Sequence, residues 1–296
     1  MAYGLEVYYA PRGDLRASRG FSAMLPQASA EAASTRPAAL LFSGLLRFRV
    51  TDFTLRVLAS AVRAAGYCSS LSELLRLDDV IRPLGVFVAY TILWAEEPRR
   101  LSFESKVREL VEHLSSRYTL DSLKEDPVFR AYRDFFWRIR VDPTKTRPSS
   151  EALVRRALRG SFPRVFTVVD AGNIASAYTG VPIGLYDLSR AAPPLTLTLS
   201  RGGEAFNPIG GEPEALPAGL PILADSRGVV MHVYPYRDSV ETAIREDTRE
   251  VLALGAGVPG VEESRVAEAV KKVYELLSPA GWSWCGEVAV KKLAGR

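Results

Sequence analysis

The chain has 296 residues, and its 38 Lys and Arg against 34 Asp and Glu give a formal net charge of +4. This length suffices for one large domain or two ordinary ones, each with an ample apolar core. The apolar runs are shorter than the roughly 18 to 20 residues that cross a bilayer, and no signal peptide is evident at the N-terminus, so a cytoplasmic protein without a membrane segment is expected. The mildly basic balance suits a polyanionic partner without establishing one.

The rare residue types support two further expectations. Cys68 and Cys285 are far apart and match no zinc or redox spacing, so two reduced, packed thiols are expected. Gln27 is the only glutamine, and Asn173 and Asn207 are the only asparagines, while arginine greatly outnumbers lysine. The scarcity of amides favours a thermophilic source, although a high-GC genome would also favour arginine.

Residues 1–84 are expected to form an N-terminal α/β extension packed on the core. Strands are predicted at 5–9 and 44–50, with a Pro, Gly, Ser and Ala-rich passage between them. A helix is predicted over about 52–66 and a short helix over 71–77.

Residues 85–296 are expected to form the main domain. Helices are predicted at 105–115, 127–139, 149–160 and 262–277. Strands are predicted at 84–95, 165–169, 195–199, 222–224, 229–234, 251–255 and 282–290. Because helices and strands are mixed without regular alternation, the pattern predicts an α+β fold with a mixed sheet, and not a doubly wound one.

A basic cluster surrounds the helix predicted at 149–160. Its cations are Arg138, Arg140, Lys145, Arg147, Arg155, Arg156, Arg159 and Arg164, and the nearby acids are Asp142 and Glu151. Ser149 is expected to cap the helix, with Glu151 in its first turn. Such a charge run is most often a solvated face, and the alternative is contact with the phosphates of a nucleic acid.

Two residues with polar side chains, Asp170 and Asn173, and the conformationally permissive Gly172 follow the strand predicted at 165–169. An acid, a glycine and an amide that leave a core strand are typical of a binding site. An equally good interpretation is that Asp170 only caps the helix that follows.

Familiar catalytic and cofactor motifs are missing from the sequence. The two histidines, His113 and His232, have no metal-ligand spacing, and we expect His113 at the surface and His232 packed within a strand. The sequence contains no P-loop, dinucleotide fingerprint or nucleophile elbow, so no metal or organic cofactor is expected.

Two long stretches, PTKTRPSSEALVRRAL and VVDAGNIASAYTGVPIGLYDL, resemble the B3/B4 editing domain of the phenylalanyl-tRNA synthetase β chain. They are most similar to freestanding, archaeal-type proteins that carry this domain alone. The resemblance continues through LTLSRGGEAFNPIGG, ILADSRGVVMHVYPYRDS and EDTREVLALGAG, and it spans about residues 85–280. It implies a mixed-sheet core of the B3/B4 type, tRNA as the partner, and hydrolysis in trans of the ester of mischarged tRNA.

The family pattern reads VDxxN, then a helix, then GQPLHAFD. Asp170, Asn173 and Asp187 fall at its aspartate, its asparagine and its closing aspartate. The family's histidine falls at Gly184, which is a departure from the pattern. A catalytic acid follows later in the family, where this chain reads YRDSVE, so either Asp238 or Glu241 matches it.

For an ester that is already activated, a site needs only to position water and stabilise the oxyanion, effects worth on the order of several kcal/mol. Asn173 and backbone amides near Gly172 are expected to donate to the carbonyl oxygen, and Asp238 or Glu241 to hold the α-ammonium or orient the water. The expected substrate-binding residues are Asp170, Gly172, Gly184, Asp187, Lys145, Arg147, Arg156 and Arg237. The alternatives are a tRNA-binding or RNA-binding module without catalysis and an amino-acid-binding regulatory protein.

Overall fold

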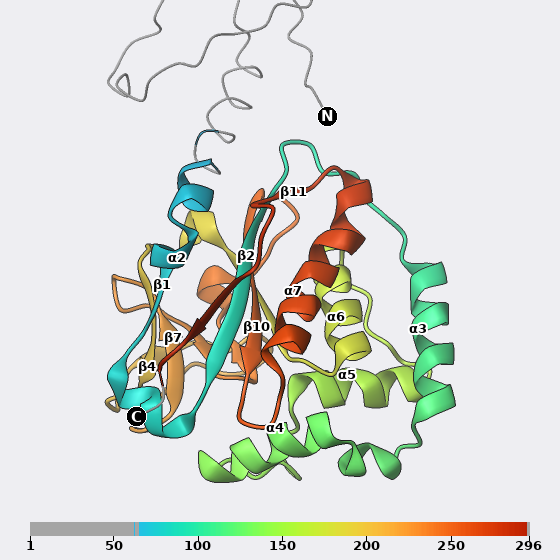
Figure 1. The fold of residues 1–296 in the computed structure, drawn as a ribbon, viewed down its shortest axis with the longest axis horizontal. Helices are drawn as coiled ribbons and strands as arrows, with labels where there is room; N and C mark the ends of the chain where they lie inside the picture. The colour runs from blue at the N-terminus through green and yellow to red at the C-terminus, as the bar shows by residue number, and fades with distance from the viewer. Residues whose placement is uncertain (1–61, 63–64, 295–296) are drawn as a thin grey trace, which may run out of the picture. The chain divides into compact units, whose positions relative to one another are not determined.

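A long antiparallel pair of strands, β2 (Phe87–Trp94) and β10 (Glu250–Gly257), lies at the centre of the computed structural model, which describes residue 62 and residues 65–294 (Figure 1). The pair is in register over its whole length, from Phe87 opposite Gly257 to Trp94 opposite Glu250. β10 is buried throughout, and β2 is buried except at its last residue. A continuous apolar run is what a strand covered on both faces requires, and the strands predicted at 84–95 and 251–255 are confirmed.

Two sheets of five strands are organised around this pair. The central sheet adds β3 (Ile183–Asp187), which is antiparallel to β10, and β11 (Ser283–Trp284) and β12 (Ala289–Lys292), which are antiparallel to β2. The second sheet runs in the order β1 (Leu75–Leu77), β4 (Leu195–Leu199), β7 (Pro221–Ala224), β8 (Val230–Val233) and β9 (Arg237–Asp238). β1 is parallel to β4 and the other pairs are antiparallel, so the fold is α+β with a mixed sheet, as predicted.

Most of the helices lie on one side of the central sheet and at its lower end, whereas the short α2 (Leu71–Leu74) lies beside β1 (Figure 1). The other helices are α3 (Glu104–Arg117), α4 (Pro127–Arg138), α5 (Ser149–Leu158), α6 (Thr167–Thr179) and α7 (Glu263–Leu277). α6 and α7 lie side by side, with α7 against β2 and β10 and α6 against β3. The helical spacing of the apolar residues in α7 predicts a single buried stripe, and its members are all buried: Val266, Ala269, Val270, Val273 and Leu277. None of the described helices is long and apolar enough to cross a membrane.

Short elements complete the described chain. Short 3-10 helices lie at Asp79–Leu84, Ser122–Glu125, Leu188–Arg190, Val240–Thr242 and Ser278–Ala280. A small ribbon pairs β5 (Ala205–Phe206) with β6 (Glu214–Ala215).

Three predicted elements need correction at their ends or faces. The helix predicted at 71–77 stops at Leu74, because the chain then extends as β1 beside β4. The strand predicted at 282–290 is divided into β11 and β12 by a loop in which Gly286 has a φ of 80°. The sequence pattern predicts that Phe129, Tyr132, Phe136 and Trp137 share one face of α4, but Trp137 is 56% exposed and Phe135 is buried.

Most of the predictions for the first 66 residues lie outside the described residues. These are the strands at 5–9 and 44–50 and most of the helix at 52–66. The division of the chain near residue 84 therefore stays a prediction.

The strand predicted at 165–169 is wrong, because α6 begins at Thr167. Phe166 precedes the helix with an extended backbone, and the Val165 N–H donates to Asp170 Oδ1 at 2.8 Å. β-branched residues favour strands, but here small residues allow a helix to approach the sheet closely. A Cβ atom on Gly172 would lie 2.6 Å from Leu185 Cδ1 of β3, so only glycine permits this contact without a shift of Leu185.

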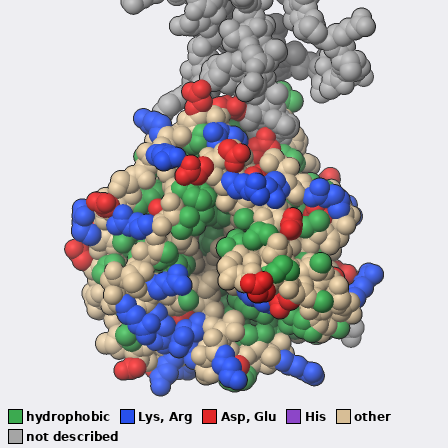
Figure 2. All heavy atoms as spheres, turned by 180° about the vertical axis from the view of Figure 1, so that it is seen from behind, with side chains coloured by type: hydrophobic (Ala, Val, Ile, Leu, Met, Phe, Trp, Pro, Cys, Tyr) green, Lys and Arg blue, Asp and Glu red, His purple; other side chains and the backbone are tan. Residues whose placement is uncertain are grey.

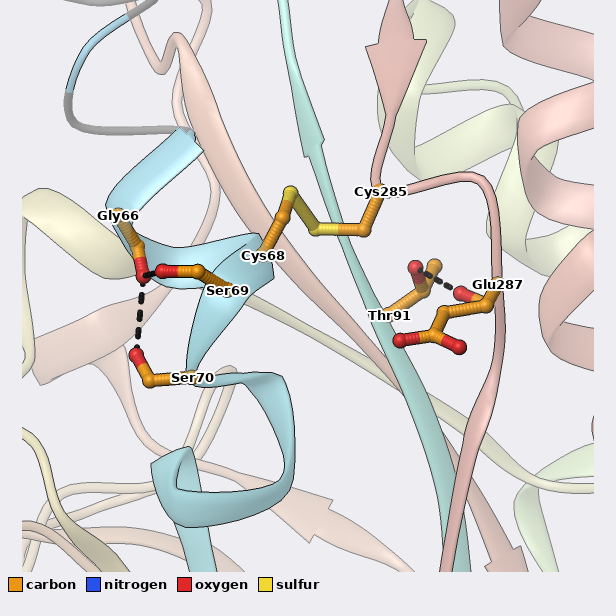
Figure 3. Close-up of a disulfide and its surroundings, with 7 residues drawn as sticks. All are labelled: Gly66, Cys68, Ser69, Ser70, Thr91, Cys285 and Glu287. Carbon is orange, nitrogen blue, oxygen red and sulfur yellow. Dashed lines mark hydrogen bonds between the residues drawn. A yellow bond between two sulfur atoms is a disulfide. The ribbon is translucent and has the colours of Figure 1, made fainter.

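Cys68 and Cys285 form a disulfide, so the expectation of two free thiols is wrong (Figure 3). Their Cα atoms are 5.2 Å apart, although 217 residues separate them in the sequence. Next to the bridge, Thr91 of β2 donates its hydroxyl to the Glu287 carbonyl at 2.7 Å. The bridge therefore connects the segment before α2 to the loop that follows β11 at the edge of the central sheet.

Replacement of Cys285 by serine is expected to lower the free energy of unfolding by about 2–4 kcal/mol, because the bridge closes a very long loop. Chemical denaturation of the wild type and Cys285→Ser, each with and without a thiol reductant, measures the effect. The reductant should destabilise the wild type to the level of the variant and leave the variant unchanged. Equal stability in all four samples would contradict the expectation.

Candidate functional site

A cavity of about 330 Å³ lies where α5, α6 and the two sheets meet. The central sheet contributes Ile183 and Gly184 of β3 and Ala256 of β10. The second sheet contributes His232 of β8 and Asp238 of β9. The cavity is thus built from segments that are distant in sequence and meet only in the folded chain.

The helix α5 presents one face to this cavity. That face consists of Ser149, Ala152, Leu153 and Arg156, which stand at positions i, i+3, i+4 and i+7 of the helix. Pro148, and not Ser149, occupies the N-cap position, and no side chain caps the helix, so the predicted cap is wrong. Ser149 is instead the first residue of the helix and lines the cavity.

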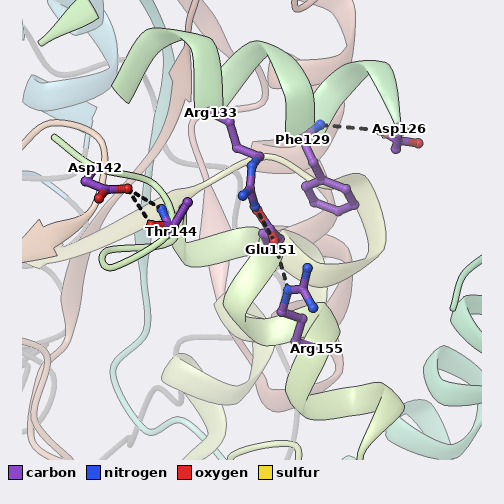
Figure 4. Close-up of polar contacts among 7 residues, drawn as sticks. All are labelled: Asp126, Phe129, Arg133, Asp142, Thr144, Glu151 and Arg155. Carbon is purple, nitrogen blue, oxygen red and sulfur yellow. Dashed lines mark hydrogen bonds and ion pairs between the residues drawn. The ribbon is translucent and has the colours of Figure 1, made fainter. Parts of the chain in front are cut away.

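The opposite face of α5 is held by a buried carboxylate (Figure 4). Glu151 has no exposed side-chain surface, and its two oxygens bind Arg133 Nη1 of α4 and Arg155 Nε, each at 2.8 Å. Arg155 was expected on the outside, but only 16% of its side chain is exposed. This part of the basic cluster joins α4 to α5 and has a structural role.

The other nearby acid, Asp142, is hydrogen-bonded within its own turn. Asp142 Oδ1 accepts hydrogen bonds from the Thr144 hydroxyl and the Thr144 N–H, at 2.6 and 2.8 Å (Figure 4). These hydrogen bonds lower the pKa of Asp142. Asp142 forms no ion pair within the described part of the chain.

Two cations of the cluster border the cavity. Arg147 and Arg156 are exposed lining residues, and neither side chain has a hydrogen bond or ion pair to any residue that the structure describes. Lys145 is exposed and is not part of the lining. The face drawn in Figure 2 is hollowed near its centre, with lysine and arginine side chains gathered below the hollow. Guanidinium groups without acidic partners are available to an anionic ligand.

The helix α6 places Asn173 and Ser176, one turn apart, on the cavity wall. Ser176 donates its hydroxyl to the Val181 carbonyl at 2.8 Å. The Asn173 side chain is half-buried and has no hydrogen bond to another described residue, so its amide can meet a ligand.

Asp170 and Gly172, two other predicted site residues on α6, do not line the cavity. Asp170 is buried and accepts the Val165 N–H, and burial raises the pKa of its carboxyl. Gly172 faces Leu185, and its amide lies beyond the first turn of α6, within the hydrogen-bonded part of the helix. Their positions indicate local structural roles, but Asp170 lies inside α6 and does not cap it, so the alternative interpretation of Asp170 as a helix cap is wrong.

The hairpin of β8 and β9 brings a histidine and a carboxylate together. His232 and Asp238 are directly opposite each other in the ladder, so their side chains share one face. The His232 Nδ1 atom lies 2.8 Å from Asp238 Oδ1, and the Tyr186 hydroxyl of β3 donates to the same oxygen at 3.0 Å. Burial, together with the Asp238 carboxylate, raises the pKa of Tyr186 well above its ordinary value.

The structure distinguishes the two carboxylates that match the YRDSVE segment. Asp238 lines the cavity and has a third of its side chain exposed, whereas Glu241 is exposed and lies outside the lining. Glu241 lies in a single 3-10 turn, and its N–H donates to the hydroxyl of Ser239, which caps that turn.

Two further predicted residues also lie away from the cavity. Asp187 is buried and accepts hydrogen bonds from Ser189 and from the Thr248 hydroxyl. Arg237 pairs with Glu214 and lies over the rings of Phe206 and Tyr236. None of the lining of the cavity comes from these two side chains.

Gly184 lies in β3 and lines the cavity together with the His232–Asp238 pair. A Cβ atom at this position would lie 2.0 Å from the Tyr186 hydroxyl oxygen and 2.5 Å from the ring carbon that carries it. Tyr186 thus occupies the space that any larger residue at position 184 would need.

His232 is the titratable residue of the cavity that was not predicted as a site residue. It is buried within a strand, as predicted, but it also lines the cavity. The available signal was an acid six residues further on, across a Tyr-Pro-Tyr turn between two short strands. That signal is weak unless the hairpin register is known.

The model of the B3/4 domain family matches residues 131–277, a range that includes every residue that lines the cavity. The chain is a B3/B4 domain protein. The B3/B4 domain thus supplies α5, α6, β3 and the β8–β9 hairpin.

No curated protein shows significant sequence similarity to the chain. Among solved structures, the chain is similar to an N-terminal fragment of the phenylalanyl-tRNA synthetase β-subunit from Pyrococcus horikoshii, with a TM-score of 0.39 and 15% identity. The match covers 75% of this chain and 54% of that one, so the chain spans about half the length of that structure.

Replacement of Glu151 by glutamine is expected to lower the free energy of unfolding by about 3 kcal/mol, because it removes the partner of two largely buried guanidinium groups. Glu125→Gln is the matched control, since its pair with Arg130 is exposed on both sides and is worth less than about 1 kcal/mol. Urea denaturation of both variants measures the difference, and equal effects would contradict the structural role of Glu151.

Proposed function

We propose that the protein is a freestanding aminoacyl-tRNA deacylase that hydrolyses the ester of mischarged tRNA in trans. The observation that carries the proposal is the convergence, in one B3/B4 cavity, of a free amide, a carboxylate and two unpaired arginines. At about 330 Å³, the cavity falls within the size range of small-molecule sites.

Each part of the substrate has a chemical counterpart in this cavity. The Asn173 amide is a donor for the carbonyl oxygen on which negative charge develops. Asp238 Oδ1 accepts bonds from His232 and Tyr186, whereas Oδ2 has no partner among the described residues and suits the α-ammonium group. Arg147 and Arg156 suit the phosphates of the tRNA end.

The proposed reaction requires positioning and charge stabilisation. A water attacks the ester carbonyl, negative charge develops on the carbonyl oxygen, and the bond to the ribose oxygen breaks. A preorganised donor aimed at the oxyanion acts more strongly in a cavity that excludes bulk water. Asn173 carries this role in the proposal.

Two further parts of the proposal are a cytoplasmic location and a thermophilic source organism. Aminoacyl-tRNA is a cytoplasmic substrate, so the protein is assigned to the cytoplasm. Intracellular disulfides are frequent in hyperthermophiles, so the Cys68–Cys285 bridge and the scarcity of amides both suit a thermophilic source.

Asp238→Asn and Asn173→Ala are each expected to lower the deacylation rate by about 100-fold, the usual effect of removing one oxyanion donor or charged partner. A panel of correctly and wrongly charged tRNAs tests the wild type and both variants. Glu241→Gln is the matched control and should keep the wild-type rate, because Glu241 lies outside the cavity.

The result would also identify the amino acid that is removed. If the wild type hydrolyses no member of the panel but binds tRNA, the deacylase proposal fails and an RNA-binding module remains. Stabilisation by free amino acids without tRNA affinity would indicate an amino-acid-binding regulatory protein.

Arg147→Ala and Arg156→Ala are each expected to weaken tRNA binding and to reduce the slope of log K against log salt by about 1, because each removes one phosphate contact. Filter binding over a range of salt concentrations measures the slope. Arg108→Ala of α3 is the control, since it removes the same charge from an exposed site outside the cavity. An equal effect of all three substitutions would indicate attraction by net charge alone.

A further inference from the structure

The ring of His232 is fixed by three contacts within the cavity wall. Its Nδ1 atom is 2.8 Å from Asp238 Oδ1, and its ring meets the rings of Tyr186 and Tyr234 edge to face, with centroids 6.0 and 5.8 Å away. Only 4% of the residue is exposed. A histidine held in this way has one orientation with respect to the cavity.

The contact with Asp238 determines which ring nitrogen remains available. A carboxylate accepts, so Nδ1 carries the hydrogen in the neutral ring and Nε2 carries a lone pair. Nε2 has no hydrogen-bond partner among the residues that the structure describes. The nitrogen left for a water or a substrate is therefore a proton acceptor.

The strand β3 has no room for a histidine of its own. Tyr186 lies over Gly184 and donates to the same Asp238 oxygen that His232 meets. Gly184 is where the sequence departs from the family histidine, and His232 reaches the same cavity from the other sheet. The cavity thus contains an imidazole, supplied by a different strand.

We propose that His232 is the general base and then the general acid of the ester hydrolysis, an inference that rests on the proposed function. The oxygen of a water forms a bond to the ester carbonyl carbon while one of its protons passes to Nε2. The carbon–oxygen bond to the ribose then breaks, and Nε2 returns the proton to the departing ribose oxygen. The products are the free amino acid and the free tRNA hydroxyl, and His232 is neutral again.

His232→Asn and His232→Ala distinguish this role from a structural one. The Asn amide nitrogen can take the place of Nδ1 and donate to Asp238, but the residue has no counterpart of Nε2. Both variants are expected to lose at least about 100-fold in kcat with KM nearly unchanged, the usual contribution of a general base. Added imidazole should restore part of the rate of His232→Ala, because it can occupy the space left by the missing ring. It should restore none of the rate of His232→Asn, because the asparagine side chain fills that space.

Thermal melting and tRNA binding of each variant establish that it is folded, and His113→Asn, on α3 outside this cavity, is the control that should keep the wild-type kcat. An active wild type together with a His232→Asn variant of nearly equal kcat would overturn the role of His232 and leave the deacylase proposal intact. Loss of activity in both variants without any rescue by imidazole would indicate a packing role and would also overturn it. An inactive wild type, across the whole panel, would overturn both proposals.

Discussion

The pairing of β10 with β2 on one edge and β3 on the other is the constraint on which the rest of the structure depends. β10 tolerates close neighbours because it has glycines at two positions: a Cβ on Gly255 would lie 2.8 Å from a Val266 methyl carbon, and one on Gly257 would lie 2.3 Å from the Phe87 ring. Tyr234 directly follows β8, and its hydroxyl lies within hydrogen-bond distance, 2.8 Å, of the carbonyl oxygens of both Phe87 and Gly257. This contact attaches the second sheet to the central pair. Because both sheets are fixed in this way, Tyr186 of one can reach Asp238 of the other.

The division of the basic cluster into two parts follows from burial. Glu151 is fully buried, so it needs partners, and it takes Arg155 from the cluster together with Arg133 of α4. Arg147 and Arg156 lie on the exposed side of the same region and have no acidic partner in the described chain. The same helix thus uses one face for stability and the other for the site, which is why charge alone did not separate the two roles in the sequence.

Burial patterns made much of the fold predictable, and long-range contacts account for what was not. The continuous run of β2 and the stripe of α7 are direct consequences of burial. The family resemblance pointed to Asn173, to Gly184 and to either Asp238 or Glu241 as site residues, and the hairpin of β8 and β9 is what places Asp238 in the cavity. VFTVV has the composition of a strand but begins α6, because the contact of Gly172 with Leu185 favours a closely packed helix there. The disulfide and the His232–Asp238 pair depend on which distant or opposed residues meet, and single-sequence patterns do not contain that information.

The placement of β2 in the chain affects how the protein is made. Both edges of this apolar strand are covered by segments synthesised much later, β10 on one side and β11 and β12 on the other. A chain still on the ribosome therefore carries β2 without its neighbours until residues after Glu250 emerge. If synthesis stalls or ends before that point, the backbone edges of this apolar strand stay unpaired. We therefore expect the nascent chain to bind chaperones that recognise extended apolar segments.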